Sequence, residues 1–360
     1  MRFTVSKSAL SRALATITKA VSSSSDKPIL GGILIDAKDG TLVMQSTDTN
    51  TSIRHSLPAN VEEDGSTVVS GKLMASIVKN LPDSAVYFSS EADAMVVTCE
   101  KSKFRLRTLD PVDFPCFPEV TPAQTVELPF DLMSKMVDKV HRMVSRDNSR
   151  PILAGILLTV GDGELRLVAT DSYRLAVCDT KVQTEESFEA IIPGIAIHQV
   201  MSLQTMEETV SIGTSDNQVI FSSGNTTYVT RRIEGSFPNY RQLLPQHHNT
   251  SVTLEADDMA NALRRAGVVA SSNPSVRLDV SDGSMTISAS SPDQGDSTET
   301  IQVQTEGESV QIGLNYHYVL DGVDSMGGEV VLETQSPMQP AVFRCHGQIN
   351  FLYLLMPVRL

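Results

Sequence analysis

Tryptophan is absent from this chain of 360 residues, and aromatic residues make up only 5% of it. Stacking on single-stranded bases needs aromatic side chains, so their scarcity argues against a single-strand-binding protein. The four cysteines form no C-x-x-C pair, and neither a disulfide framework nor a zinc site is expected. No apolar run approaches the length of a membrane span, and the first residues contain no signal-peptide core. We therefore expect a cytoplasmic protein with no membrane partner.

Catalytic motifs are missing as well. The sequence has no G-x-x-x-x-G-K-[ST], G-x-G-x-x-G, H-E-x-x-H or G-x-S-x-G, so four common kinds of enzyme site lack their usual residues. An S-x-x-K from Ser24 to Lys27 and an S-D-N from Ser215 to Asn217 match two of the three motifs of penicillin-recognising enzymes, but no K-T-G completes the set. We interpret both as polar turns. A binding protein is expected, with no catalytic residue, no cofactor and no metal.

Positive charge is in deficit, because 29 Lys and Arg stand against 43 Asp and Glu and the net charge is −14. This acidic balance argues against a protein that coats nucleic acid with its whole surface. It leaves room for a local basic surface, so the positions of the Lys and Arg residues matter more than their number.

The sequence does contain an internal repeat. PILGGILIDAKDGTLVMQSTD, which begins at Pro28, aligns without a gap with PILAGILLTVGDGELRLVATD, which begins at Pro151. The same alignment places Thr47-Asp48 opposite Thr170-Asp171. A weaker third copy, SVRLDVSDGSMTISAS, begins at Ser275. Three repeats therefore account for the chain, and we place the domains at residues 1–122, 123–248 and 249–360.

The pattern within each repeat predicts secondary structure. A short strand precedes an amphipathic helix, as where Leu10, Leu14, Ile17 and Val21 recur at helical spacing. Runs of β-branched residues joined by Asp-Gly turns follow, and then a second short helix such as GKLMASIVKNL and further hairpins. This alternation predicts an α+β fold built on antiparallel sheets.

A basic stripe is predicted on the first helix of the second repeat. Its members lie 4, 3 and 4 residues apart and so share one helix face: Lys135, Lys139, Arg142 and Arg146. Lys27 and Arg150 lie in loops that follow the predicted helices. A solvated helix face is the ordinary explanation of one such stripe, but basic residues recur at the same place in all three repeats of an acidic chain. Since no base-reading motif is present, we expect sequence-independent contact with the phosphates of duplex DNA.

A second charged pattern predicts self-association. Four basic residues alternate along one predicted strand of the first repeat, which places them on one face: Lys101, Lys103, Arg105 and Arg107. Three acidic residues lie on or beside a strand of the third repeat: Asp293, Asp296 and Glu299. We predict a head-to-tail contact between these two surfaces, with apolar contacts carrying most of the affinity. The alternative is a charged edge that prevents aggregation.

Three segments carry a resemblance to a known family: VATDSYRLAV from Val168, EGSFPNYRQLLP from Glu234 and the ending LLMPVRL from Leu354. With the three repeats, they make the whole chain resemble the bacterial DNA polymerase III beta subunit family of DNA sliding clamps. The resemblance implies a head-to-tail homodimer ring of six clamp domains, with helices lining a central channel and sheets outside. It implies a processivity subunit that encircles duplex DNA and tethers the polymerase III catalytic subunit, the clamp loader, and other polymerases and repair proteins through short hydrophobic peptides.

Helix geometry agrees with two chains in the ring. If each repeat contributes two helices packed ~9.5 Å apart, twelve helices enclose roughly 26 Å of free diameter. Six helices would leave about 8 Å, which is too narrow for a duplex roughly 20 Å wide.

The resemblance also implies a peptide pocket between the second and third domains, floored by the chain's C-terminus. The matching positions in this sequence are Leu153, Thr170, Ser172, Tyr173, Arg174, Leu175, Pro238, Gln242, Leu243, Met338, Pro340, Leu354, Met356 and Val358. Apolar walls with a few polar groups suit peptide capture. Taken singly, each of these residues is more often part of a core.

The sequence departs from the family pattern at Gln242, where a basic residue is common, at Val358, where Met is common, and in the loop from Ser22 to Lys27. Two other functions remain open from the residues alone. One is an enzyme with a diverged site in the cleft between domains, which a turnover screen would detect. The other is a sequence-specific DNA-binding protein, which affinity for different short duplexes would reveal.

Overall fold

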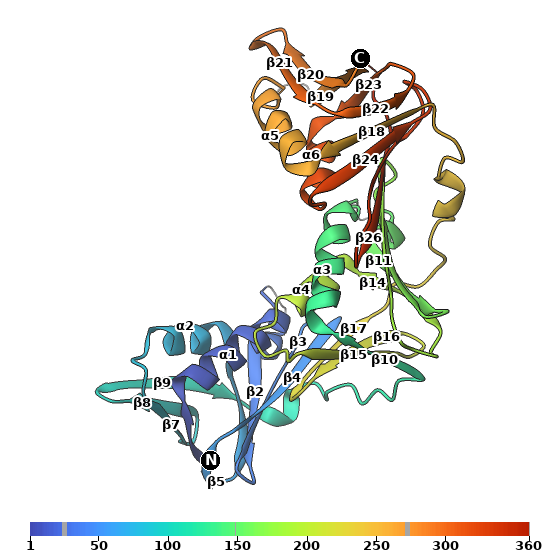
Figure 1. Cartoon of the computed structure of the whole chain (residues 1–360). Helices are drawn as coiled ribbons and strands as arrows, with labels where there is room; N and C mark the ends of the chain where they lie inside the picture. Colours follow the sequence, from blue (N-terminus) through green and yellow to red (C-terminus); the bar gives the residue numbers. More distant parts are fainter. Residues whose placement is uncertain (24–26, 148, 271–273, 360) are drawn as a thin grey trace. The chain divides into compact units, whose positions relative to one another are not determined.

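The computed structural model describes residues 1–23, 27–147, 149–270 and 274–359 (Figure 1). The predicted S-x-x-K and loop include Ser24 to Asp26, and the terminal motif includes Leu360; these residues lie outside the described ranges. The chain forms two compact units, one of Met1–Met133 with Ile195–Arg232 and the other of Ser134–Gly194 with Ile233–Leu360. The described part of the chain contains no helix long and apolar enough to cross a membrane.

The first unit is built on one sheet of thirteen strands, in the order β10-β15-β16-β17-β4-β3-β2-β6-β9-β8-β7-β1-β5. Its strands are β1 (Arg2–Ser6), β2 (Gly32–Lys38), β3 (Thr41–Thr47), β4 (Thr51–Pro58), β5 (Asn60–Glu63), β6 (Gly65–Ser70), β7 (Ala85–Ser90), β8 (Ala94–Cys99), β9 (Ser102–Leu109), β10 (Gln124–Pro129), β15 (Thr209–Thr214), β16 (Gln218–Ser223) and β17 (Thr226–Arg231). Helices α1 (Lys7–Ile17) and α2 (Gly71–Asn80) pack together against it. The Ser6 side chain caps α1 by accepting a hydrogen bond from the Ala9 N–H, which satisfies one of the free donors of the first turn.

The second unit contains a nine-stranded sheet, in the order β14-β11-β12-β13-β26-β25-β24-β18-β22, and a four-stranded sheet, in the order β21-β20-β19-β23. Its strands are β11 (Gly155–Gly161), β12 (Glu164–Thr170), β13 (Arg174–Lys181), β14 (Phe188–Pro193), β18 (Thr250–Glu255), β19 (Ser275–Ser281), β20 (Ser284–Ser291), β21 (Gly295–Gln302), β22 (Gln304–Gly307), β23 (Val310–Asn315), β24 (Glu329–Thr334), β25 (Ala341–Cys345) and β26 (Asn350–Leu355). Its own helices are α5 (Ala256–Ala266) and α6 (Tyr316–Asp324), which pack against each other. The chain passes from one unit to the other within two further helices, α3 (Phe130–Val140) and α4 (Gly194–Met201).

The predicted α+β class with antiparallel sheets is confirmed. The three Asp-Gly pairs form hairpin turns in which both residues have positive φ, at 49° and 73° for Asp39-Gly40, 53° and 71° for Asp162-Gly163, and 43° and 79° for Asp282-Gly283. Such turns match the twist of the flanking strands, which is why this dipeptide was a reliable signal.

The repeats share their sheets. Strand β17 of the second repeat pairs with β4 of the first, with Thr226 opposite His55. In the same way β26 of the third repeat pairs with β13 of the second, with Phe351 opposite Cys178. Each junction between repeats is therefore a continuous backbone ladder, and neither strand at a junction is left with a free edge.

Candidate functional site

The Thr170-Asp171 pair forms the turn between β12 and β13. The Thr170 hydroxyl donates to the Arg174 carbonyl at 2.6 Å, and the Asp171 carboxylate accepts from the backbone N–H groups of Tyr173 at 3.0 Å and Arg174 at 3.1 Å. Ser172 has a φ of 80°. These bonds fix the backbone of the turn and leave 60% of Tyr173 exposed at its tip.

The first repeat builds the same turn from Thr47 and Asp48. The Thr47 hydroxyl donates to the Thr51 carbonyl at 2.9 Å, Asp48 accepts from the Thr51 N–H at 2.8 Å, and Thr49 has a φ of 81°. The Thr-Asp pair is therefore sufficient to form the turn. Arg174, which stands where the first repeat has Thr51, must serve another purpose.

The apolar face of β13 and β26 lies beside this turn. Leu175 is paired with Leu354, and Val177 with Leu352. These side chains belong to a buried cluster that also contains Leu157, Val168, Ile191, Tyr240 and Val342. The segment between β17 and β18, which brings Tyr240 to the cluster, covers the face of the sheet opposite α5 and α6 (Figure 1).

The C-terminal segment passes next to the turn. After β26 ends, the Met356 N–H donates to the Tyr173 carbonyl at 2.9 Å, and the Val358 N–H donates to the Gly313 carbonyl at 2.8 Å. Met356 keeps 43% of its surface exposed. The last described residues thus place an exposed thioether side chain beside the exposed Tyr173.

Exposure divides the predicted pocket residues into two groups. Among the described residues of the second unit, five large apolar side chains are exposed: Tyr173, Leu243, Val268, Met338 and Met356. Four of these five were predicted to line the pocket, and exposed apolar side chains are the usual contacts of a binding surface. Ser172, Pro238 and Gln242 are also exposed, and Pro340 and Val358 are half-buried.

The other predicted pocket residues are buried: Leu153, Thr170, Arg174, Leu175 and Leu354. They can support a pocket but offer little surface of their own.

Arg174 illustrates this support. Its guanidinium group donates to Asp171 at 2.9 Å, to Asp321 of α6 at 2.7 Å and to the Arg142 carbonyl at 2.8 Å. The same group lies 4.2 Å from the centre of the Tyr318 ring. Burial alone would lower the pKa of Arg174, but its interactions with Tyr353, Asp321 and Asp171 raise the pKa more, so the group stays charged. Each of the three guanidinium nitrogens thus donates to a different partner.

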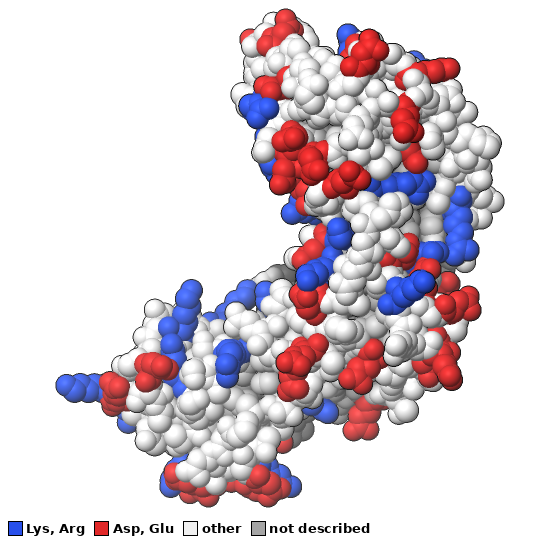
Figure 2. All heavy atoms as spheres, viewed as in Figure 1, with Lys and Arg blue, Asp and Glu red and all other residues white. Residues whose placement is uncertain are grey.

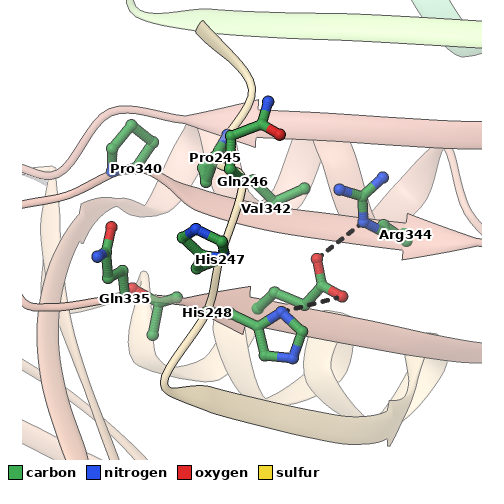
Figure 3. Close-up of a pocket in the computed structure, with 10 residues that line it drawn as sticks. Pro245, Gln246, His247, His248, Gln335, Pro340, Val342 and Arg344 are labelled. Carbon is green, nitrogen blue, oxygen red and sulfur yellow. Dashed lines mark hydrogen bonds and ion pairs between the residues drawn. The ribbon is translucent and has the colours of Figure 1, made fainter.

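Pro340 lies in a separate cavity of about 170 Å³ (Figure 3). The linker residues His247 and His248 cross β24 and β25 there, and the His248 Nδ1 lies 3.7 Å from the Glu333 carboxylate. Glu333 also accepts from the Arg344 Nε at 2.8 Å. A cavity of this size suits a small side chain better than a whole peptide.

The junction between the first and second repeats offers an internal comparison. Ser52 and Arg54 occupy the positions that correspond to Leu175 and Val177 of the second repeat. The Arg54 guanidinium lies 4.0 Å from the centre of the Phe117 ring, and both residues line a cavity of about 310 Å³. The same architecture is thus polar at one junction and apolar at the other. Only the second is suited to a hydrophobic peptide.

The predicted basic stripe is only partly a helix face. Helix α3 ends at Val140, a 3-10 turn follows at His141–Met143, and Arg146 lies in a loop, so the prediction of one helix carrying all four residues is wrong. The reason is a tertiary hydrogen bond, in which the Ser145 N–H donates to the Leu153 carbonyl at 2.7 Å and requires an extended backbone. Lys139 is half-buried and donates to the Ser325 carbonyl at 2.6 Å.

The remaining basic candidates are exposed: Lys27, Lys135, Arg142, Arg146 and Arg150. Arg150 binds Asp147 and donates to the Ser172 hydroxyl at 2.9 Å, which ties it to the Thr170-Asp171 turn. Figure 2 shows Lys and Arg interspersed with Asp and Glu over the visible face of each unit. On the face that Figure 2 shows, attraction for phosphates would come from a few side chains and not from a broad basic surface.

The predicted interface residues also fall into two groups. Lys103, Arg105 and Arg107 share one face of β9, but Lys101 lies in the preceding turn, so its assignment to the strand is wrong. Arg105 pairs with Glu91 at 3.0 Å and with Asp93 at 2.7 Å within its own chain.

On the acidic side, Asp293 lies in the turn before β21 and Asp296 lies on the strand. Glu299 binds Arg265 of α5 at 2.7 Å and 2.9 Å, and this hydrogen bonding lowers the pKa of its carboxyl group. Because strand residues alternate between faces, Glu299 and Asp296 point to opposite sides of β21. Asp296 is therefore the better placed of the two for an intermolecular contact.

Sequence reasoning missed Tyr240 and Asp321. Tyr240 lies in the segment EGSFPNYRQLLP that carried the resemblance, and its burial could have been inferred from its match with Phe117 in the repeat. Asp321 gave no local signal, because its partner Arg174 is 147 residues away.

Comparison with protein families gives three consecutive matches. Residues 1–118 match the N-terminal domain of the DNA polymerase III beta subunit, residues 127–239 its central domain, and residues 241–359 its C-terminal domain.

Curated relatives and solved structures give the same result over the full length. The chain is 30% identical to the beta sliding clamp of Staphylococcus aureus, with 100% of this chain and 99% of the relative covered. It is similar to the crystal structure of the DNA polymerase sliding clamp from Bacillus subtilis, with a TM-score of 0.95, 29% identity, and 100% and 99% of the two chains covered. A sliding clamp from Pseudomonas aeruginosa bound to griselimycin has a TM-score of 0.95 and 26% identity, with both chains fully covered.

Proposed function

Because the chain belongs to the DNA polymerase III beta subunit family, we propose that two copies close head to tail into a ring around duplex DNA. The family's members are sliding clamps, processivity factors that hold a polymerase on DNA and catalyse no reaction. Domains at residues 1–122, 123–248 and 249–360 are part of this proposal. The observation that carries it is the repeated ladder at the junctions, since the same pairing can continue from one copy to the next.

Repeat symmetry identifies the two strands that would pair between copies. At the first junction, β17, the last strand of the second repeat, pairs with β4, which follows the Thr47-Asp48 turn of the first repeat. At the second junction, β26, the last strand of the third repeat, pairs with β13, which follows the Thr170-Asp171 turn of the second repeat. The corresponding strands without such a partner among the described residues are β9 and β21. Strand β21 is the edge of its sheet, and residues 102–107 of β9 pair only with β8. We infer that β9 of one copy pairs with β21 of the other.

The register follows from the same correspondence. Thr226 of β17 is paired with His55 of β4 at the first junction. The position equivalent to Thr226 on β9 is Ser102, and the position equivalent to His55 on β21 is Glu299. Antiparallel pairing from that point places Arg105 opposite the partner's Asp296 and Lys103 opposite the partner's Thr298. Phe104 lies on the same strand, is 37% exposed and supplies apolar surface, whereas Leu106 is buried within its own chain. The pair of Arg105 with the partner's Asp296 would help to set the register, and apolar contacts would supply most of the affinity.

DNA would be held by exposed basic side chains without reading of its sequence. We propose Lys27, Lys135, Arg142, Arg146 and Arg150 as phosphate contacts, and we assign Lys139 a smaller part because its ammonium group is engaged by Ser325. Few contacts of this kind give weak binding that salt reduces strongly. A ring that must slide benefits from such weakness.

Partner proteins would dock through short hydrophobic peptides beside the Thr170-Asp171 turn. We propose that Tyr173, Leu243, Met338 and Met356 contact the peptide, supported by the buried Leu175 and Leu354, and that griselimycin binds at the same place. Partners of this kind would include the polymerase III catalytic subunit, the clamp loader, and other polymerases and repair proteins.

Topological linkage gives the decisive test. The protein is loaded onto a nicked DNA circle, the salt is raised, and the circle is then cut once, with bound protein followed by gel filtration. We expect the protein to survive the salt and to leave after cutting, because a closed ring is held by linkage and not by contact energy. Loss before cutting, or retention after it, would contradict the ring.

A further inference from the structure

The carboxylate of Asp321 lies between two arginines of the second unit, one exposed and one buried. Its Oδ2 accepts a hydrogen bond from the Arg174 Nη1 at 2.7 Å, and its Oδ1 lies 3.9 Å from the Arg142 Nη1. The Arg142 side chain is 48% exposed and the Arg174 side chain only 8%. One acidic group is thus shared by a surface cation and a buried cation.

We propose that Asp321 and Arg174 are positioning residues that couple phosphate contact at Arg142 to peptide binding beside Tyr173. This inference rests on the proposed function, because it takes the DNA-facing role of Arg142 and the peptide site from it. Neither Asp321 nor Arg174 needs to contact the DNA or the peptide.

A chain of direct contacts joins the two places. Arg174 binds both the Arg142 carbonyl, at 2.8 Å, and the Asp171 carboxylate, at 2.9 Å. Asp171 accepts the Tyr173 N–H at 3.0 Å, and the Tyr173 carbonyl accepts the Met356 N–H at 2.9 Å. Every step from Asp321 to the exposed Tyr173 and Met356 is a hydrogen bond between described residues.

The first repeat indicates that this chain is not needed to form the turn. Thr47 and Asp48 hold the equivalent turn in the same geometry, with Thr51 in place of the arginine. Arg174 therefore adds something that the turn itself does not require, namely its links to α6 and to Arg142 in the 3-10 turn that follows α3. Those links connect the peptide site with the basic surface.

The direction of the coupling follows from the shared carboxylate. When a phosphate binds Arg142, that guanidinium is drawn from Asp321, and the carboxylate then interacts with Arg174 alone. The stronger contact holds Arg174 and the Asp171 turn more firmly, so a peptide that binds beside Tyr173 loses less conformational freedom. Because coupling between binding sites is reciprocal, the peptide also strengthens DNA binding by the same factor.

The test measures the affinity of griselimycin by calorimetry, with the dimer free and with the dimer saturated by a short duplex at low salt. We expect wild-type protein to bind griselimycin about two- to fivefold more tightly with DNA, the range that an exposed ion pair can contribute. Asp321→Asn and Arg142→Gln should each bind with the same affinity in both conditions. Arg277→Gln is the matched control, since it removes an exposed arginine of β19 that belongs to neither the proposed phosphate contacts nor the peptide site, and it should keep the dependence on DNA.

Arg174→Thr, which copies the first repeat, should bind griselimycin more weakly and without dependence on DNA. No binding to DNA-free wild type would refute both the pocket and this inference. Binding that DNA leaves unchanged in the wild type, or that DNA still strengthens in Asp321→Asn, would refute the coupling alone. A purely structural role for Asp321 would lower thermal stability without removing the difference between the two conditions.

Discussion

Replacing Met356 with Ala tests the partner site with the least disturbance to the fold. The residue follows the last strand, and 43% of its surface is exposed before any partner binds. The backbone hydrogen bond from its N–H to the Tyr173 carbonyl does not involve the side chain and remains in the variant.

The expected magnitude follows from the exposed fraction. Complete burial of a Met side chain contributes about 1.5–3 kcal/mol. If a peptide or griselimycin covers the 43% that is exposed, the variant should lose about 0.6–1.3 kcal/mol of binding free energy, or about three- to ninefold in Kd. Less apolar surface would be buried on binding, so the heat-capacity change should also be smaller in magnitude.

Calorimetric titration with griselimycin measures both quantities. Ile195→Ala is the control, because Ile195 is 84% exposed and lies outside the predicted pocket. Its affinity should match that of the wild type, and both variants should melt within a few degrees of it. An unchanged Kd for Met356→Ala, or an equal loss in the control, would show that Met356 is not part of the site.

Three further changes test other parts of the structure. Deletion of residues 356–360 should abolish griselimycin binding while light scattering still reports a dimer, because the segment follows the last strand; a truncated protein that binds normally would exclude the pocket. Lys103→Glu with Arg105→Glu should raise the Kd of the dimer in sedimentation experiments, and Asp296→Lys should recover part of the loss if the proposed register is right. Burial lowers the pKa of His55 below 6.5, so the folded protein holds that proton less well than the unfolded chain does; stability should be complete above pH 6.5 and fall as the pH drops below it, and His55→Gln should flatten that slope in urea unfolding.

Local signals predicted most of the fold. The Asp-Gly pairs at 39, 162 and 282 specify turns that need positive φ at both residues, and few other sequences adopt that conformation without strain. Helical spacing gave α1, although the predicted pattern ran on to Val21 and the helix ends at Ile17. It failed at the end of α3, where the Ser145–Leu153 hydrogen bond imposes an extended backbone on a sequence that could have continued the helix. Tertiary contacts of that kind leave no trace in periodicity.

The candidate site was predictable in its position but not in its division of roles. The resemblance located Tyr173, Met356 and Arg174 together, yet it could not distinguish exposed contacts from buried supports. That distinction depends on Asp321, which is distant in the sequence. It also depends on the face of the strand that carries each side chain, because one face packs against the segment between β17 and β18 and the other against α6. Strand β21 makes the same point, since the bond between Glu299 and Arg265 of α5, 34 residues away, gave no local signal.

The shared sheets also determine the order in which the chain can fold during synthesis. Strand β13 pairs with β12 soon after both are made, but its other neighbour, β26, ends at Leu355 near the end of the chain. Roughly 170 residues separate them, and at typical translation rates the edge of β13 stays open for roughly 10–35 seconds. Its sequence, RLAVCDTK, contains the apolar run LAVC, and an open edge of this kind can pair with a neighbouring nascent chain. Ribosomes spaced closely on one message would therefore favour aggregation of this protein, and chaperones that bind extended apolar segments would be needed most in the interval before the last strand emerges.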